Sequence, residues 1–345
     1  MGATETTATV ANDAVEYFLE EQRYHGRSER TVAAYARVIR RFERYLQETA
    51  STGLAEASRR QCMEWIHSIR PELAPSTVAT YASYLHRFYA YMVEIGEFNR
   101  NPMRLVMEEL TESIENDPTR RDISIERMRN FVNSIEHPLH KCLIIVLLKT
   151  GMRVGELCNL DCRDLNLATP SSYNLPQPRG ELDGRANSLF VSSTPIRGQE
   201  YNGEIRTASN KRQRQTIIPV DGEVEHVIHR WLAIRPNPRS PANPLFLNTA
   251  DKWGERIDPE TVRRIVRGYS SEAGWYQSGG SRTENVTPHY FRHFFTTHLR
   301  DRTGDRGIVK YLRGDVADDI LDTYTHNWGD RVRTHYESNI YSLLG

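Results

Sequence analysis

The chain has 345 residues, more than one hydrophobic core commonly supports, so its length predicts two domains. Hydrophobic residues make up 38% and charged residues 26%, a balance that excludes a fully disordered chain. The 45 basic and 45 acidic residues cancel, so net charge gives no support to a nucleic-acid partner, and any such surface must be local.

Short apolar runs and few cysteines narrow the class of protein further. The longest apolar run, Cys142–Leu148, is far shorter than a membrane span. Residues 1–12 lack the basic start and apolar core of a secretory signal. Four scattered cysteines make neither a disulfide framework nor a convincing zinc site. We therefore expect a cytoplasmic protein in a reducing compartment, with no membrane partner.

The first part of the chain has the pattern of a small helical domain. Residues 1–12 are small and polar, and we expect them to form a flexible tail. Residues 13–107 carry apolar side chains at helical spacing and show no strand pattern. Helices are predicted around Val15–Leu19, from Ser28 to Leu46, over Cys62–Ile69 and from Ser76 to Met92. Residues 108–121 are charged, contain a proline and are predicted to be a linker.

Residues 122–345 predict a second domain that is mainly helical with a small β-sheet, an α+β arrangement. Strand-like pieces occur at Ser188–Val191 and Gln215–Val220, after a long loop at residues 168–187. Helices are predicted at Met128–Ile135, Lys141–Thr150, Glu223–Ile234, Pro259–Ser270, Pro288–Asp301 and Arg331–Leu344. Gly151 is placed to end the buried second of these helices.

Two helical stretches are interrupted by polar residues. The segment TGMRVGELCNL carries Arg153 and Glu156, a pair that by itself is typical of a solvated surface. The segment TPHYFRHFFTTHL places His289, Arg292 and His293 on one face of an otherwise apolar helix. The two histidines have a spacing that zinc ligands use, but no third ligand is near in the sequence.

Two later segments add basic residues and a tyrosine. The stretch RTASNKRQRQTIIPV has no acidic residue and predicts either a basic turn against a phosphate backbone or a solvated hairpin. Its basic residues are Arg206, Lys211, Arg212 and Arg214. Lysine is rare in this chain, with five among 45 basic residues, which makes Lys211 conspicuous. The segment YLRGDVADDILDTYTH follows, with Asp315 and Tyr324.

Taken in order, these segments resemble the catalytic domain of the tyrosine recombinases, the integrase and Xer family. Thr150–Leu157 resembles the segment with the family's first arginine, and His289–His293 resembles its His-x-x-Arg-His box. Lys211 lies eight residues before Pro219, where the family keeps a hairpin lysine. Tyr324 follows the box arginine by 32 residues, the interval of Xer-like members. The helical first domain resembles the family's core-binding domain.

The resemblance implies a site-specific recombinase and assigns its catalytic residues. Arg153 and Arg292 would hold the non-bridging oxygens of a DNA phosphate with their planar forks. Tyr324 would attack the phosphorus and form a 3′-phosphotyrosyl bond, releasing a 5′-hydroxyl. Lys211 would protonate the leaving oxygen, provided that a neighbouring charge and partial burial lower its pKa. His289 would be the acid–base partner.

The resemblance also implies supporting residues and partners. Glu156 is expected to orient an arginine, and His293 to pack or give support. The remaining basic residues of the turn, Arg206, Arg212 and Arg214, are expected to bind DNA. Two domains would clamp double-stranded DNA, and a homotetramer would exchange strands through a Holliday junction. Neither a metal nor an organic cofactor is implied.

The chain departs from the family pattern at one position. Asp315 stands where the family has a second histidine or a tryptophan. Its carboxylate would repel a phosphate unless it is protonated, turned away or bound to an arginine such as Arg313. This departure leaves Tyr336 as an alternative nucleophile to Tyr324.

Other interpretations therefore stay open. The chain could be a catalytically inactive DNA-binding protein on the same fold, or a nicking and resealing enzyme like the type IB topoisomerases. Its last helix, with Ile340, Leu343 and Leu344 on one face, could dock on a neighbouring protomer or on its own domain.

Overall fold

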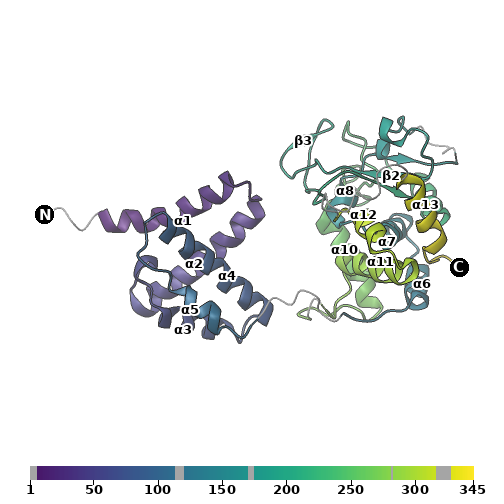
Figure 1. The fold of residues 1–345 in the computed structure, drawn as a ribbon. Coiled ribbons are helices and arrows are strands. Elements are labelled where there is room, and N and C mark those ends of the chain that lie inside the picture. Colours follow the sequence, from purple (N-terminus) through teal and green to yellow (C-terminus); the bar gives the residue numbers. More distant parts are fainter. Residues whose placement is uncertain (1–5, 113–119, 170–174, 281–282, 316–327) are drawn as a thin grey trace. The chain divides into compact units, whose positions relative to one another are not determined.

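The computed structural model describes residues 6–112, 120–169, 175–280, 283–315 and 328–345. The chain divides into two compact units, Met1–Pro118 and Thr119–Gly345, and the division falls within the predicted linker (Figure 1). None of the helices in the described ranges is long and apolar enough to cross a membrane.

The first unit is built from helices packed around one apolar core. These are α1 (Thr6–Tyr24), α2 (Glu29–Ala50), α3 (Arg59–Ile69), α4 (Pro75–Glu94) and α5 (Met103–Glu109), with a 3₁₀ turn at Leu54–Glu56. Ser28 begins α2 as predicted, because its hydroxyl accepts a hydrogen bond from the backbone N–H of Thr31. The buried faces of α2 and α4 carry Phe42 and Phe88, both fully enclosed.

Two boundaries in this unit differ from the prediction. The predicted tail at residues 1–12 is wrong from Thr6 onward, because α1 begins there. The segment TTATVAN holds no glycine or proline, so nothing interrupts a helix that the following amphipathic residues nucleate. Helix α5 was not predicted, and it runs two residues into the predicted linker. Pro102 marks its start, and the side chain of Asn101 accepts a hydrogen bond from the N–H of Met103.

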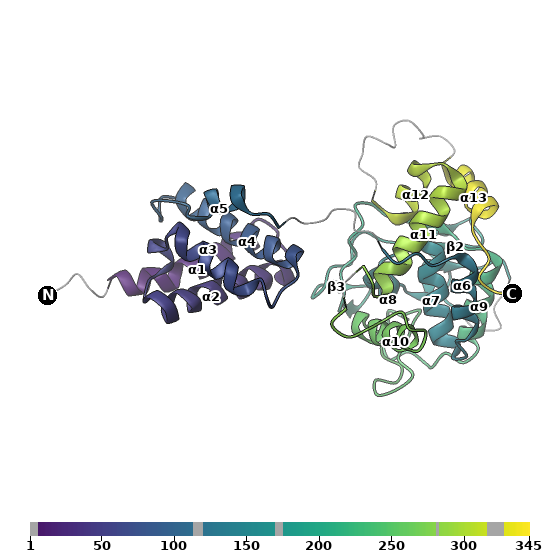
Figure 2. The same ribbon diagram turned by 90° about the horizontal axis from the view of Figure 1, so that it is seen from below.

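The second unit packs helices against a three-stranded antiparallel sheet (Figures 1 and 2). The sheet order is β1-β2-β5, and Ser188 pairs with Pro219 while Val191 pairs with Thr216. The strands are β1 (Leu165–Asn166), β2 (Ser188–Val191), β5 (Thr216–Pro219) and a separate hairpin, β3 (Glu200–Tyr201) with β4 (Glu204–Ile205). The helices are α6 (Ile125–Asn133), α7 (Pro138–Thr150), α8 (Val154–Cys158), α9 (Gly222–Leu232), α10 (Pro259–Glu272), α11 (Pro288–Thr303), α12 (Arg306–Arg313) and α13 (Trp328–Asn339). Both predicted strands and the α+β class are confirmed.

Helix α7 is the central helix of this unit and packs against α9 and α11 (Figure 2). Residues 142–150 along it are all buried. Gly151 ends α7 in the left-handed conformation, with φ of 62°, as the sequence predicts. A Cβ atom at this position would collide with the ring of Phe295 on α11, so the site needs glycine for space as well as for backbone freedom.

The C-terminal segment lies on its own unit. The helix predicted to reach Leu344 ends at Asn339 instead, and Leu343 beyond it is buried in the core. The carboxylate of Glu223 on α9 accepts hydrogen bonds from the backbone N–H groups of Leu343 and Leu344. These two N–H groups therefore bond to a side chain of α9 and not to carbonyls of a continuing helix. In this structure of a single chain the segment packs on its own unit, and docking on a neighbouring protomer stays an alternative prediction.

Helix α12 was also not predicted. Its eight residues lie between Gly304 and Gly314 and include three basic residues, so the segment is too short and too polar to show a clear helical pattern. The carboxylate of Asp305 caps its first turn by accepting from the N–H groups of Gly307 and Ile308.

Replacing Gly151 with alanine tests the packing at the end of α7. We expect Gly151→Ala to lower the free energy of unfolding by about 2–4 kcal/mol, because it adds backbone strain to overpacking against Phe295. Gly304→Ala is the matched control, since Gly304 also has a positive φ of 66° but a Cβ added there would meet no atom within 4 Å. We expect the control to cost about 1 kcal/mol. Urea unfolding measures both, and equal losses would refute the packing argument.

Candidate active site

Arg153 lies at the start of α8, three residues after α7 ends. The fully buried carboxylate of Glu156 accepts from the backbone N–H of Arg153 at 2.9 Å and from its Nη1 at 3.0 Å. This double contact fixes both the backbone and the side chain of Arg153, which remains 31% exposed. The pair is therefore not the solvated surface pair that its spacing alone suggests.

Arg292 projects from α11 into the same place, and its side chain is 3% exposed. Its Nη1 donates to the carbonyl oxygens of Gly151 at 2.6 Å and Arg313 at 3.0 Å. The guanidinium thus joins the end of α7 to the end of α12, while its Nη2 points toward Asp315.

Asp315 lies between the two arginines. Its Oδ1 accepts from Arg153 Nη2 at 2.6 Å, and its Oδ2 accepts from Arg292 Nη2 at 2.6 Å. Arg313 Nη2 lies 2.8 Å from the same Oδ2. The sequence left three possibilities for this carboxylate: protonated, turned away, or bound to an arginine. The structure has the last of these. Asp315 binds Arg313 and also both arginines that were assigned to the phosphate.

Burial and neighbouring charges together shift the pKa values of the groups in this cluster. Partial burial raises the pKa of Asp315, but the charges of Arg292, Arg313 and Arg153 lower it more, and the net direction is down. Burial, and then the positive charge of Arg153, lowers the pKa of Arg292 to about 10, so it stays protonated at neutral pH. The pKa of Arg153 is raised instead, because its burial is outweighed by Glu156 and Asp315.

The basic loop before β5 does not present all its arginines to solvent. Arg206 is 1% exposed, and its guanidinium donates two hydrogen bonds to the buried carboxylate of Asp161. Arg212 is 5% exposed, and its Nε lies 3.2 Å from Glu156 Oε2. These two side chains were predicted to bind DNA, but in this structure each guanidinium pairs with a buried acid from a distant part of the sequence. Arg214 is half-buried.

Lys211 and the two histidines lie near the arginine pair. Lys211 is exposed and lacks the partial burial that was expected of it, and its backbone carbonyl accepts from Arg153 Nη1 at 3.2 Å. His289 is exposed on the first turn of α11, three residues before Arg292. His293 is half-buried, with its ring centroid 6.1 Å from that of Tyr290. Within the described part of the chain, no group of three or more histidine, cysteine or acidic residues could hold a metal ion.

Of the two candidate nucleophiles, the structure describes only Tyr336. Tyr324 lies outside the described residues, which end at Asp315 and resume at residue 328. Tyr336 is fully buried on α13, and its hydroxyl donates to the carbonyl of Lys149 at 3.0 Å. Burial raises the pKa of this hydroxyl well above its ordinary value. In this structure the hydroxyl of Tyr336 is closed to a phosphate, so the geometry does not favour Tyr336 as the alternative nucleophile.

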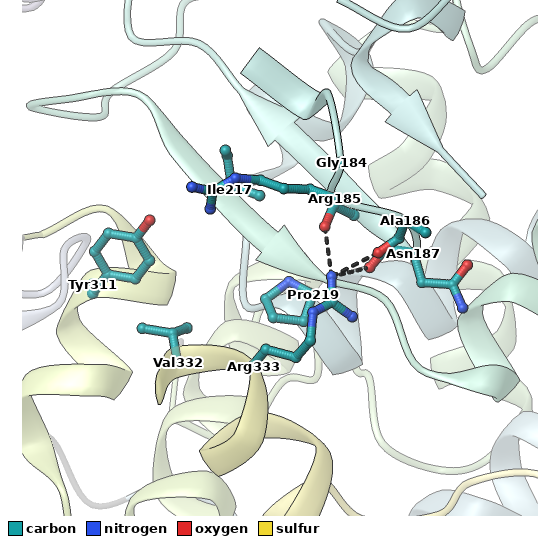
Figure 3. A pocket seen from close by; sticks show the side chains of 10 residues that line it. Gly184, Arg185, Ala186, Asn187, Ile217, Pro219, Tyr311, Val332 and Arg333 are labelled. Atoms are coloured by element: carbon teal, nitrogen blue, oxygen red, sulfur yellow. Dashed lines mark hydrogen bonds between the residues drawn. The ribbon is translucent and has the colours of Figure 1, made fainter. Parts of the chain in front are cut away.

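A separate cavity of about 400 Å³ lies between the sheet and helices α12 and α13 (Figure 3). Tyr311, Val332 and Arg333 line it from the helices, facing Ile217 and Pro219 of β5. Arg333 donates to the carbonyls of residues 186 and 187 and to the hydroxyl of residue 188. These bonds tie α13 to the start of β2, so this cavity belongs to the anchorage of α13 and not to the arginine cluster.

Sequence reasoning missed the structural partners of the site. It gave no role to Gly155 or Gly314, where a Cβ would lie 2.9 Å from the carbonyl oxygen of Ser209 and 2.7 Å from Arg212 Cγ, respectively. It also did not place Arg212 next to Glu156. The glycines within the motifs were the available signal, because a glycine inside a polar motif indicates close approach of another backbone or side chain.

Replacing Asp315 with asparagine tests the charge of this cluster. A carboxylate whose folded pKa lies below its unfolded value, about 3.9, adds stability that is complete above that value and is lost as the pH falls through the folded pKa. We therefore expect Asp315→Asn to be less stable than the wild type at pH 6, and the difference to shrink toward pH 3. Asp301→Asn is the control, an exposed carboxylate paired with Arg300, and we expect only a small difference in stability. Chemical denaturation at several pH values measures both; a constant difference for Asp315→Asn would contradict the assignment.

Two family models match separate parts of the chain. The model of the phage integrase family matches residues 199–330, and the model of its N-terminal SAM-like domain matches residues 15–96. The first match includes Lys211, His289, Arg292 and Tyr324, whereas Arg153 lies before it.

Curated relatives extend the similarity over most of the chain. The tyrosine recombinase XerC of Pelobacter propionicus is 24% identical over 315 residues, covering 90% of this chain and 89% of that protein. The tyrosine recombinase XerD of Listeria monocytogenes is 25% identical over 340 residues, covering 94% and 98%.

Solved structures show the same fold. The Tn1549 transposon integrase in complex with a circular intermediate DNA matches with a TM-score of 0.65 at 18% identity, covering 94% of this chain and 98% of that one. A lambda integrase dimer bound to a core site matches with a TM-score of 0.58 at 15% identity, covering 95% and 82%. With both family models in order, relatives along most of its length and the arginine pair assembled, the chain belongs to the phage integrase family of tyrosine recombinases.

Proposed function

We propose that the chain is a site-specific DNA recombinase whose arginine cluster binds the phosphate that is cut. One observation carries this assignment: the forks of Arg153 and Arg292, from separate helices, each place an Nη2 atom 2.6 Å from one carboxylate. Carboxylate and phosphate oxygens accept the same planar, bidentate hydrogen bonds from guanidinium groups. A phosphodiester fits the place that the carboxylate of Asp315 occupies.

The charge of the cluster suits an anionic substrate. Four guanidiniums, those of Arg153, Arg212, Arg292 and Arg313, face two carboxylates, those of Glu156 and Asp315. The excess of positive charge matches a phosphodiester, which carries one negative charge that spreads onto its non-bridging oxygens during displacement. Glu156 is engaged on both sides by arginine and does not face a substrate.

The chemical step is an in-line displacement at phosphorus. The hydroxyl oxygen of Tyr324 forms a bond to phosphorus while the bond to the 5′ oxygen breaks. The tyrosine proton passes to His289, which is exposed at the start of α11. The 5′ oxygen leaves with a proton from Lys211, so a 3′-phosphotyrosyl ester and a 5′-hydroxyl result. The ester conserves the bond energy, and the reverse step rejoins a strand without ATP.

The partner of this site is double-stranded DNA. Supporting this assignment, the Tn1549 and lambda integrases were solved on DNA, and the Xer relatives are recombinases by name. We further propose that two DNA sites are paired by a homotetramer. Sizing of the complex by light scattering, with and without DNA that carries two sites, tests the tetramer.

Trapping the covalent intermediate tests the proposed function. Nicked duplexes from the DNA that flanks the gene are screened for binding and then for an adduct that survives denaturation. We expect an adduct on the peptide with Tyr324, and Tyr324→Phe to abolish it, because the oxygen that forms the ester is gone. Mass spectrometry of the adducted peptide gives the position.

Tyr336→Phe is the matched control for this experiment. It removes only a buried hydrogen bond to Lys149, so we expect lower stability by about 1 kcal/mol and an unchanged adduct. Binding without an adduct would favour the inactive DNA-binding protein. Cleavage and resealing without strand transfer between two duplexes would favour the topoisomerase-like activity.

The role of Asp315 in DNA binding can be measured separately. We expect Asp315→Asn to bind the cleavage-site duplex about three- to tenfold more tightly at fixed salt, because a carboxylate no longer competes with the phosphate for Arg153 and Arg292. Asp301→Asn changes net charge equally at an exposed position outside the cluster and is expected to gain less. Fluorescence anisotropy measures both. Weaker binding by Asp315→Asn would show instead that the carboxylate is needed to hold the arginine forks in place.

A further inference from the structure

The loop that carries Lys211 is anchored on the residue before it. The side-chain amide of Asn210 donates to the carbonyl of Ser192 at 2.7 Å, and its Oδ1 accepts from Asn159 at 2.8 Å. Its backbone N–H donates to the carbonyl of Pro195 at 2.8 Å. Lys211 follows with an exposed side chain, but its carbonyl is held by Arg153. The backbone at Lys211 is thus fixed while its ammonium group faces solvent.

The residue after Lys211 anchors the loop on the other side. The side chain of Arg212 has no exposed surface, and its Nε lies 3.2 Å from Glu156 Oε2. Its Nη1 donates to the carbonyl of Leu312 in the last turn of α12 at 3.0 Å. Burial lowers the pKa of Arg212, and the charge of Glu156 opposes this. One guanidinium therefore connects the lysine loop, the partner of Arg153 and the helix that leads to Asp315.

Two glycines show how closely these parts are packed. A Cβ on Gly314 would lie 2.7 Å from Arg212 Cγ and 2.7 Å from its Nη1, so the end of α12 rests directly on this side chain. A Cβ on Gly155 would lie 2.9 Å from the carbonyl oxygen of Ser209, so the same loop also rests on α8. Movement of Arg212 would be transmitted to α12 and α8 because no space separates them.

We propose that Arg212 is a positioning residue for the leaving-group proton, holding the backbone of Lys211 against Arg153 so that the Lys211 ammonium faces the 5′ oxygen. This inference rests on the proposed function. Arg212 itself touches neither the DNA nor the reacting atoms. In the step concerned, the bond between phosphorus and the 5′ oxygen breaks and one proton moves from Lys211 Nζ to that oxygen.

A sulfur leaving group separates this role from a general loss of structure. Where sulfur replaces the bridging 5′ oxygen of the nicked duplex, the thiolate leaves without a proton. Arg212→Gln is expected to slow adduct formation on the oxygen substrate by about 10- to 100-fold, part of the usual contribution of a general acid. On the sulfur substrate the variant is expected within about threefold of the wild type, since no acid is needed. The measured quantity is the ratio of the two rates.

Two further variants complete the test. Lys211→Ala should show the same rescue by sulfur, and adding Arg212→Gln to it should slow the oxygen reaction little further, because both changes remove one function. Arg206→Gln is the matched control, a buried arginine of the same loop that pairs with Asp161 away from the site. It should lower the melting temperature without changing the rate ratio. Arg212→Lys, which keeps the charge beside Glu156, provides a second reading if the glutamine variant does not fold, with an intermediate ratio expected.

The outcomes are distinct. Equal slowing of Arg212→Gln on both substrates, or additive effects with Lys211→Ala, would overturn the positioning role and leave the recombinase assignment intact. Failure of the wild type to form an adduct on either substrate would overturn the proposed function and this inference with it. Rescue by sulfur confined to the Lys211 and Arg212 variants supports the proposal.

Discussion

The arrangement of the site depends on the buried carboxylate of Glu156. It lies between Arg153 and Arg212, with no exposed surface. A buried carboxylate is tolerated only when cations and hydrogen bonds surround it, and removal of one partner from such a set is typically destabilising by about 3–5 kcal/mol. Both arginines are therefore held where they are by the cost of leaving Glu156 unpaired. One of them faces the phosphate position, and the other fixes the loop of Lys211.

A second constraint follows from the close approach of helix ends. Arg292 reaches the carbonyls of Gly151 and Arg313, where α7 and α12 end, and Asp315 follows one residue after Gly314. Both glycines have positive φ, and each lies against a side chain that fills the space of a Cβ. The fork of Arg292 is thus held by backbone carbonyls at the ends of two helices, so it is positioned before any DNA arrives.

The sequence was sufficient for the fold class and for the motifs, but not for the contacts among the motifs. Continuous apolar runs located α7 and the strands β2 and β5, because elements that are buried on nearly all sides are apolar along most of their length. The convergence of Arg153 and Arg292 was inferred through the family resemblance. The buried state of Arg212 could not be predicted, since it depends on Glu156, 56 residues earlier in the chain. In the sequence, arginines that pair with buried carboxylates cannot be distinguished from arginines that bind phosphates.

The end of α7 links the site to the C-terminal segment. The last carbonyls of a helix have no partners within it and must find donors elsewhere. Here Tyr341 donates to Leu148, Tyr336 to Lys149 and Arg292 to Gly151, so the tail and the active site use three carbonyl acceptors at one helix end. A tail that left this position would expose two carbonyls beside the one that orients Arg292. The packing of the tail on its own unit is therefore part of what holds the phosphate-binding fork in place.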